Sequence, residues 1–436
     1  FDTGPWPRMS PSDRADALDR LSDALVARMP RMAAAIVDEA GFPATSAGPV
    51  HVGLAIEFLR YYARLIRGHP FEEARPHANV SVQIRRVPVG VVAAIAPWNI
   101  PILGALSKIA PALAAGCTVV FKPSPETPLG AYILAEATHE AGIPAGVLNI
   151  LPANLQGSVR LTEHPDVDMI GFTGSTAVGK QIALACAAQL RRCALELGGN
   201  AAAIVLEDAP PSLLAGLAHL GLALNNGEAC IAQRRILVPR ARHDEIVGLL
   251  CTAAKGLAVG DPNTPGTMIG PMVSRVHQRR VLDYIEIGRA EGATVACGGR
   301  APEGLEQGFY VEPTVLANVN NTMRVAREEI FGPVVCVIPY DSVEEAIAIA
   351  QDTEYGLSSS VWTADPDAGA EIGRRLRVGS LYVNATMTLD PAIPFGGFKH
   401  SGLGRENGPE GLAEYCELQP LFTPIQAPAA VQEGAT

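Results

Sequence analysis

The chain has 436 residues, of which 48% are hydrophobic and 18% charged, and it carries a net charge of -11. This length is too great for one small core, so we expect two closely connected domains. The acidic balance argues against nucleic acid as a partner, because phosphates need a basic face, and no apolar run approaches the ~18 residues of a membrane helix.

The eight cysteines form neither a Cys-x-x-Cys pair nor the spacing of zinc ligands, so we expect no metal site. Reduced thiols in a cytoplasmic protein account for them most simply. The chain opens at Phe1 rather than Met, which suggests that a segment upstream is absent. The cysteines are Cys117, Cys186, Cys193, Cys230, Cys251, Cys297, Cys336 and Cys416.

Short β-rich runs alternate with Ala- and Leu-rich stretches through the first half, which is typical of a mostly parallel sheet covered by helices. A polar stretch at 75–86 is expected to reach outside its domain as an arm. The expected strands are 87–96, 118–122, 147–151, 168–172, 194–197 and 202–206, and the expected helices are 102–115, 176–190 and one capped by Thr127 with Pro128 in its first turn.

The second half repeats this alternation. It ends in a small-residue tail, 426–436, that we expect to be mobile. The expected strands are 235–238, 334–339, 359–362 and 380–383, and the expected helices are 342–351 and 368–376.

Residues 172–180 read Phe-Thr-Gly-Ser-Thr-Ala-Val-Gly-Lys at a strand-to-helix junction, where free N–H groups and the helix dipole favour an anion. The next residue is Gln181, whereas a Walker A loop needs Ser or Thr there for magnesium. This excludes the NTPase interpretation and favours the pyrophosphate of a dinucleotide. No Gly-x-Gly-x-x-Gly follows the early strands, so the binding mode is not that of an ordinary Rossmann domain.

Two polar segments follow strand ends, and two further loops are rich in Gly and charge. Asn99, in Pro-Trp-Asn, could donate to an oxygen that acquires negative charge, although alone it is equally a turn residue. Lys122 follows the next strand, where α/β proteins place ligand contacts. Loops 328–333 and 394–406 are rich in Gly and charge, and by composition alone they could be surface turns.

Two Gly-marked turns carry a candidate nucleophile and base: Cys230 ends Asn-Asn-Gly-Glu-Ala-Cys, and Glu196 begins Glu-Leu-Gly-Gly-Asn. A thiol attacks carbonyl carbon as the thiolate, so it needs local activation. Taken singly, each segment is equally a buried thiol or a tight turn. The chain has no Gly-x-Ser-x-Gly and no His-Glu-x-x-His, which removes the main competing hydrolytic schemes.

In order and spacing, these motifs closely resemble the NAD(P)-dependent aldehyde dehydrogenase superfamily across nearly the whole chain. The resemblance implies an α/β fold with a Rossmann-like cofactor domain (1–70 and 88–197), an α/β catalytic domain (198–411), and a β oligomerisation arm with tail (71–87 and 412–436). A homodimer or homotetramer is expected, since exposed strand edges pair with a neighbour.

The resemblance also implies a mechanism. Cys230 would attack an aldehyde, and the Asn99 amide and the Cys230 backbone N–H would hold the oxyanion of the thiohemiacetal. After hydride transfer, Glu196 would activate water against the thioester. Lys108 and Glu417 match positions proposed to relay protons or water. A nonredox thioesterase or esterase, and a catalytically silent structural homologue, are the alternatives.

For the cofactor, NAD or NADP, the resemblance places Lys122 on the adenosine ribose, Ser175 on the pyrophosphate, and Glu329 and Phe331 at the nicotinamide ribose. The remaining residues expected to shape this site are Trp98, Ser124, Gly174 and Leu197. Many NAD-preferring relatives carry Glu at the position of Pro125, so we hypothesise that NADP is tolerated here.

Glu228 stands where the family usually has Gln, two residues before the nucleophile. We expect its side chain to point away from Cys230 into solvent, because a carboxylate facing the thiol would disfavour its thiolate. The residues expected to line the substrate tunnel are Ile100, Gly104, Ser107, Ala229, Ile231, Leu389 and Phe395. Small side chains at 104 and 107 predict a roomy apolar tunnel for medium-chain or aromatic aldehydes, unless neighbouring side chains fill the space.

Overall fold

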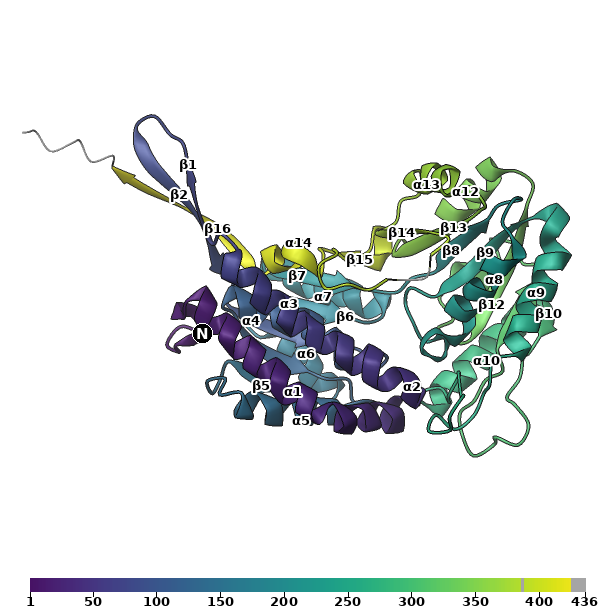
Figure 1. Ribbon diagram of the computed structural model, residues 1–436, viewed down its shortest axis with the longest axis horizontal. Coiled ribbons are helices and arrows are strands. Elements are labelled where there is room, and N and C mark those ends of the chain that lie inside the picture. Colours follow the sequence, from purple (N-terminus) through teal and green to yellow (C-terminus); the bar gives the residue numbers. More distant parts are fainter. Residues whose placement is uncertain (386–387, 425–436) are drawn as a thin grey trace, which may run out of the picture.

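Three sheets organise the molecule (Figure 1). The computed structural model describes residues 1–385 and 388–424, so the predicted tail at 426–436 lies outside the described residues. Two sheets are mostly parallel and covered by helices, and the third is a small antiparallel ribbon that projects from the body. Across the described ranges, no helix has both the length and the apolar character needed to cross a membrane.

A six-stranded sheet contains most of the predicted first-half strands. Its order is β15-β7-β6-β3-β4-β5, and every pairing except β15 with β7 is parallel. Buried aliphatic side chains dominate the central strands, as expected where both faces are covered. The strands are β3 (Val91–Ile95), β4 (Thr118–Lys122), β5 (Leu148–Ile150), β6 (Met169–Thr173), β7 (Arg192–Glu196) and β15 (Gly402–Leu403).

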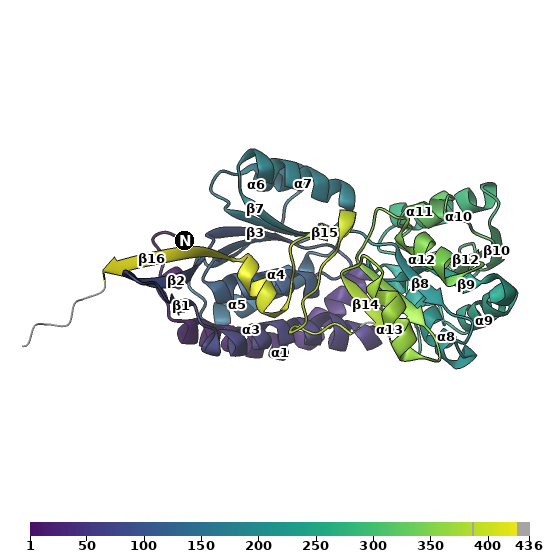
Figure 2. The same ribbon diagram turned by 90° about the horizontal axis from the view of Figure 1, so that it is seen from above.

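Helices cover both faces of this sheet (Figure 2). The largest apolar core joins the sheet to the helices of one face, and a smaller core lies under the helices of the other. The first face carries α1 (Pro11–Ala40), α3 (Leu54–Gly68), α4 (Leu103–Ala115) and α5 (Leu129–Glu140), and the second carries α6 (Leu155–Glu163) and α7 (Thr176–Ala188).

The chain order reverses between β3 and β6, because β4 and β5 extend one way from β3 while β6 and β7 extend the other. In open α/β sheets, ligands bind at the carboxyl ends of the strands beside such a switch point. The residues that follow β3, β4, β6 and β7 therefore share one edge.

The second half forms a seven-stranded sheet in the order β10-β11-β12-β9-β8-β13-β14. Only β10 with β11 is antiparallel. The strands are β8 (Ala201–Val205), β9 (Gln233–Pro239), β10 (Thr294–Cys297), β11 (Thr314–Ala317), β12 (Val334–Tyr340), β13 (Ser358–Trp362) and β14 (Ser380–Val383), and the longer helices are α8 (Pro211–Ala218), α9 (His243–Lys255), α10 (Arg275–Ala290), α12 (Val343–Gln351) and α13 (Pro366–Arg374).

The predicted polar arm is a ribbon of β1 (Glu72–Arg75), β2 (Val80–Pro88) and β16 (Cys416–Pro424). The β16 strand, which follows α14 (Gly408–Glu414), pairs with all of β2 and leaves Leu418 and Phe422 exposed. Two N-terminal helices, α1 and α3, had no counterpart in the sequence predictions. Between them lie the short α2 (Ala44–Ser46) and a π-helical turn, Ala47–Gly53. Residues of the π-helical turn contribute to the site described below.

Two local predictions were wrong. The single strand expected at 87–96 is the end of β2 and the whole of β3, separated at Gly90, whose φ of +129° breaks the run. Thr127 does not cap α5, because Pro128 occupies the cap position and the Thr127 hydroxyl donates instead to the Trp98 carbonyl oxygen.

Candidate active site

The nucleophile predicted at Cys230 ends a tightly anchored loop that leads into β9. Asn225, Asn226 and Gly227 are consecutive left-handed residues, a conformation that Asn and Gly adopt most readily. The Asn226 amide donates to the carbonyl oxygens of Gly41 (3.0 Å) and Pro271 (3.2 Å) and accepts from the backbone of the loop at 270. These contacts, with the N-terminal segment at Gly41 and with the loop at 270–271, hold the turn that precedes Cys230.

Cys230 lies at the junction of two hollows, one apolar and one polar. Burial raises the pKa of its thiol to about 12, and the charges of Glu329 and Glu196 act in the same direction. The backbone N–H groups of Cys230 and Ile231 oppose this shift. The thiol is therefore the resting form, and a reaction at sulfur requires that a proton be removed.

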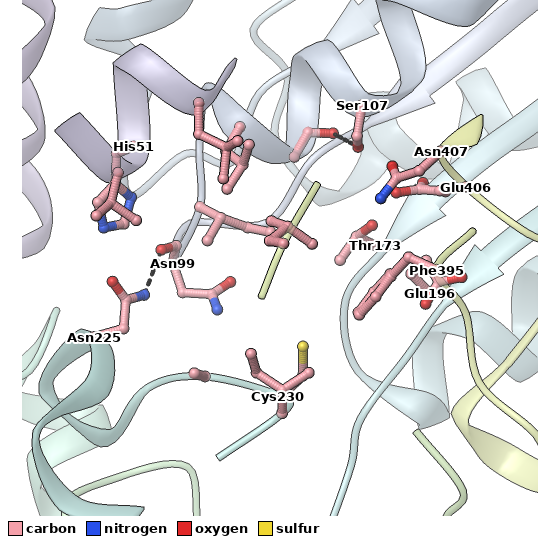
Figure 3. A pocket seen from close by; sticks show the side chains of 18 of the residues that line it. His51, Asn99, Ser107, Thr173, Glu196, Asn225, Cys230, Phe395, Glu406 and Asn407 are labelled. Atoms are coloured by element: carbon pink, nitrogen blue, oxygen red, sulfur yellow. Dashed lines mark hydrogen bonds between the residues drawn. The ribbon is translucent and has the colours of Figure 1, made fainter. Parts of the chain in front are cut away.

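Asn99 follows β3 and lines both hollows beside Cys230 (Figure 3). One N–H of its amide donates to the Glu228 carbonyl oxygen (2.8 Å), and Asn225 Nδ2 donates to the Asn99 carbonyl oxygen (2.7 Å). Since an amide group has two N–H bonds, the second can donate to an oxygen held against the thiol. The loop that carries Cys230 thus also fixes the orientation of Asn99.

Glu196 is the last residue of β7 and reaches the apolar hollow. Its carboxylate is buried, and neither oxygen has a hydrogen-bond partner among the described residues. Burial raises the pKa of Glu196 well above its ordinary value, the negative charge of Glu406 adds to this, and Lys108 and Arg405 oppose it. A carboxylate with a raised pKa is a stronger base, as general-base catalysis near neutral pH requires.

Lys108 is completely buried in α4, and its partner is Glu406. Its Nζ donates to Glu406 Oε1 (2.6 Å), to Thr173 Oγ1 (2.5 Å) and to the Gly104 carbonyl oxygen (3.3 Å). Glu406 and Thr173 line the apolar hollow together with Glu196. The hollow that Cys230 lines thus holds two carboxylates, Glu196 and Glu406, and the second is paired with the buried Lys108.

The prediction that Glu417 belongs to this relay was wrong. Glu417 lies on β16, where it is half exposed and forms an ion pair with Arg192 (2.7 Å). The carboxylate beside Lys108 is that of Glu406, the last residue of the Gly-rich loop at 394–406. The one local signal was a lysine inside an otherwise apolar predicted helix, 102–115, which indicates a buried ammonium group with a carboxylate close by but does not identify that carboxylate.

The apolar hollow contains all seven residues predicted for the substrate tunnel: Ile100, Gly104, Ser107, Ala229, Ile231, Leu389 and Phe395. Its far wall was not predicted. That wall comes from the π-helical turn and α3 and consists of Val50, His51, Leu54 and Phe58, with Leu103 and Leu224 completing the apolar lining. The wall was missed because it lies about 170 residues or more before Cys230 and has no motif.

The two small positions have different surroundings. A Cβ at Gly104 would lie 3.1 to 3.3 Å from side-chain atoms of Pro97 and Ile100, so neighbouring side chains already fill part of the expected space. The Ser107 hydroxyl donates to the Gly104 carbonyl oxygen (3.2 Å), so its polar hydrogen is turned toward its own helix. The room in the tunnel therefore depends more on position 107 than on position 104.

The polar hollow is a cleft at the shared strand edge, and it contains six of the eight predicted cofactor residues: Trp98, Gly174, Ser175, Leu197, Glu329 and Phe331. Ser175 caps α7, which presents its N-terminus to the cleft. Glu329 Oε1 accepts from the Gly199 N–H (3.1 Å), and burial raises the pKa of Glu329 to about 7. The N-terminus of α7 can bind a phosphate group, and the Glu329 carboxylate can accept hydrogen bonds from hydroxyl groups. Both properties fit a dinucleotide.

The other two predicted cofactor residues, Lys122 and Ser124, lie outside that lining, at the end of β4. Both are buried, and β4 is separated from β6 only by β3. They therefore occupy the same edge of the sheet, on the far side of β3 from Ser175. His277 and Arg280 of α10 also line the cleft and were not predicted.

Glu228 is buried, so the expectation that its side chain is solvated was wrong. Its Oε1 accepts from the Val273 N–H (3.3 Å) and lies 3.5 Å from His277 Nε2. The side chain does turn away from Cys230, because it lines neither hollow. Burial raises the pKa of Glu228 well above its ordinary value, which favours the neutral acid.

Taken together, the site offers a thiol between an apolar hollow and a cleft whose helix N-terminus and carboxylate suit phosphate and hydroxyl groups. An apolar molecule with one reactive carbonyl can reach the thiol from one side, and a nucleotide can reach the same atom from the other. No group of described residues has the composition and spacing to hold a metal ion. The arrangement suits a group-transfer or hydride-transfer reaction between two molecules that are bound on the two sides of Cys230.

Comparisons with known proteins agree with this geometry. The model of the aldehyde dehydrogenase family matches residues 2–421. The chain is 46% identical to a geranial dehydrogenase of Castellaniella defragrans, with 96% of this chain and 87% of that protein covered. A crystal structure of a Mycobacterium tuberculosis aldehyde dehydrogenase complexed with NAD+ has a TM-score of 0.94 at 42% identity and covers 98% of this chain and 89% of that one.

A mutant of aldehyde dehydrogenase C from Pseudomonas syringae, complexed with NAD+ and octanal, has a TM-score of 0.92 at 39% identity. It covers 95% of this chain and 85% of that one. In these relatives the match extends over both large sheets rather than over one of them.

Proposed function

Because this chain belongs to the aldehyde dehydrogenase family and oxidises aldehydes with a nicotinamide cofactor, we propose that Cys230 is its nucleophile and Glu196 its general base. The observation that carries this assignment is the position of Cys230, which lines both the apolar hollow and the polar cleft. The aldehyde enters the hollow, and the cofactor lies in the cleft.

In the first step, the thiol gives its proton to the Glu196 carboxylate, which releases it to solvent before the second step, and sulfur bonds to the carbonyl carbon. The carbonyl oxygen becomes negative and accepts hydrogen bonds from the Asn99 amide and the Cys230 backbone N–H. When bound, the nicotinamide supplies the acceptor for the hydride that leaves this carbon. The product on the protein is a thioester at Cys230.

In the second step, Glu196 takes a proton from water, and the oxygen of that water attacks the thioester carbon. The carbon–sulfur bond then breaks, which releases the carboxylic acid and returns Cys230 as thiolate. The absence of any hydrogen-bond partner for the Glu196 oxygens among the described residues supports this role, because nothing there competes for the water. Lys108 holds Glu406 beside it and so limits the negative charge around Glu196.

We propose that the substrates are medium-chain or aromatic aldehydes. The lining of the tunnel is mostly apolar, and no charged group stands at its far wall to clamp a substrate carboxylate. Apart from Asn99 and Glu196, its polar members are His51, Ser107, Thr173, Asn225, Glu406 and Asn407. The relatives named for geranial, or bound to octanal, support an apolar substrate.

We further propose that residues 1–70 and 88–197 form the cofactor domain, that 198–411 form the catalytic domain, and that 71–87 with 412–436 form an oligomerisation arm. The exposed apolar residues of β16 support a homodimer or homotetramer. The free cysteines of the chain support a reducing, cytoplasmic location.

The test is a panel of aldehydes assayed with NAD and NADP, following reduced nicotinamide. Reduced cofactor should form with octanal and phenylacetaldehyde at higher kcat/KM than with acetaldehyde. Comparable kcat/KM for all three would contradict the substrate class. Ester hydrolysis that needs no nucleotide, with no reduced cofactor from any aldehyde, would instead favour the thioesterase alternative.

A further inference from the structure

The loop after β4 gathers three polar side chains at the edge of the six-stranded sheet. Ser124 and Thr127 close a turn, in which the Thr127 N–H donates to the Ser124 carbonyl oxygen (3.2 Å). Pro125 and Glu126 are its central residues. Proline at the first central position presets the backbone of such a turn, so the chain has one well-defined path here.

In this turn the Glu126 side chain folds back toward Ser124, near the end of β4. The Ser124 hydroxyl donates to Glu126 Oε2 (2.5 Å), although Glu126 is otherwise exposed. The turn is also tied to the nucleotide cleft, because the Thr127 hydroxyl donates to the Trp98 carbonyl oxygen (3.4 Å). The carboxylate is therefore held at the mouth of β4 rather than free in solvent.

Lys122 ends β4, is 7% exposed and lies close enough to this carboxylate to interact with its charge. Burial lowers the pKa of its ammonium group, and the charge of Glu126 is what opposes that shift. A buried ammonium and a carboxylate beside it offer donors and acceptors for vicinal hydroxyls, and they lie across β3 from the phosphate site at Ser175.

We propose that Glu126 is the residue that selects NAD over NADP, by accepting hydrogen bonds from the adenosine ribose hydroxyls and repelling a 2′-phosphate. The inference rests on the proposed nicotinamide-dependent function. This inference replaces the expectation that NADP is tolerated because Pro125 stands where many relatives have Glu. Pro125 itself has no carboxylate, but the turn that it shapes places the carboxylate of the next residue, Glu126, at the same end of β4. Ser124 acts as a positioning residue for that carboxylate.

The test is calorimetric binding of NAD and NADP to the substrate-free protein, which does not depend on turnover. The wild-type protein should bind NAD at least about tenfold more tightly than NADP, since a carboxylate and a phosphate at contact repel strongly. Glu126→Gln should lose most of this ratio, chiefly through tighter NADP binding. Ser124→Ala should lose part of it, because the carboxylate is then less well placed.

Glu163→Gln, at the exposed end of α6, makes the same charge change at a site distant from the turn and should leave the ratio as in wild type. Equal binding of NAD and NADP by the wild-type protein, or an unchanged ratio in Glu126→Gln, would overturn this inference and leave the proposed function standing. Failure of both nucleotides to bind would overturn this inference and the proposed function together.

Discussion

The apolar hollow and the polar cleft meet at Cys230 but are built in opposite ways. The hollow is lined mainly by side chains from α3, α4, the π-helical turn and several loops, with the ends of β6 and β7, and its shape is set by their volumes. The cleft is formed by strand ends, a helix N-terminus and a few charged groups, so backbone contributes much of its chemistry. A side-chain change can therefore resize the hollow, whereas the cleft should tolerate such changes except at its charges.

The largest effect should follow from removing the atom that both regions share. Cys230→Ser should lower kcat by at least about 10⁴-fold, because a hydroxyl at this site has no neighbouring base strong enough to ionise it. Production of reduced cofactor measures this loss. Calorimetric binding of NAD should be retained, since the cleft is otherwise intact, and loss of that binding would show that the two regions are not separable at Cys230.

Glu196→Gln should lower steady-state kcat by about 10²- to 10³-fold, as expected for loss of a general base. Since the raised pKa of Glu196 keeps it protonated above its ordinary range, and only the carboxylate accepts a proton, the wild-type kcat should rise with pH through that raised pKa. The pH profile of kcat in the variant should lack this rise. An unchanged profile would assign the base elsewhere.

Lys108→Met should destabilise the protein by about 3–5 kcal/mol, because it leaves Glu406 buried without its partner. Chemical denaturation measures the loss. The double variant Lys108→Met/Glu406→Gln should recover part of it, since no charge is then left unpaired. No recovery would mean that packing of the lysine side chain, rather than the ion pair, accounts for the effect.

Ser107→Phe should lower kcat/KM for phenylacetaldehyde relative to acetaldehyde by more than about tenfold, because it fills the hollow without touching the cleft. KM for the cofactor should stay as in wild type. Ser107→Ala is the matched control: its hydroxyl already donates to Gly104, so its removal should change the ratio by less than about twofold. A large effect of the alanine would point to a polar contact with the substrate.

The smallest effect is expected from Glu417→Gln, which lies in neither region. Its ion pair with Arg192 is half exposed, and such pairs add little stability. Steady-state kcat should stay within about twofold of wild type. A loss comparable with that of Glu196→Gln would restore Glu417 to the relay and contradict the assignment of Glu406.

The sequence predicts the cleft from local signals and the hollow from aligned family positions, for a physical reason. Strand ends, Gly-rich turns and helix starts have local signals, so Ser175, Glu329 and Asn99 could be placed from short motifs. The seven tunnel residues could also be predicted, from their match to family positions. The structure shows that they line the hollow, but it does not test their roles. The far wall at His51 and Phe58 depends on long-range packing of helices that have no motif.

The burial of charged side chains was the property that could be predicted least well from the sequence. Glu228 and Glu406 are charged residues in polar-looking segments, and both are enclosed by the fold. Only tertiary contacts reveal that one faces His277 and the other Lys108. A composition-based expectation of solvent exposure is sound for most carboxylates and fails where a buried partner is available.

The most direct test of the account is the mass of Glu196→Gln after it is mixed with NAD and octanal and quenched in acid within the first turnover. We expect a protein that is heavier by one octanoyl group, with the acyl group on the peptide that contains Cys230 and no such adduct in Cys230→Ser. Reduced cofactor formed without any acyl adduct, or an adduct on another residue, would contradict it.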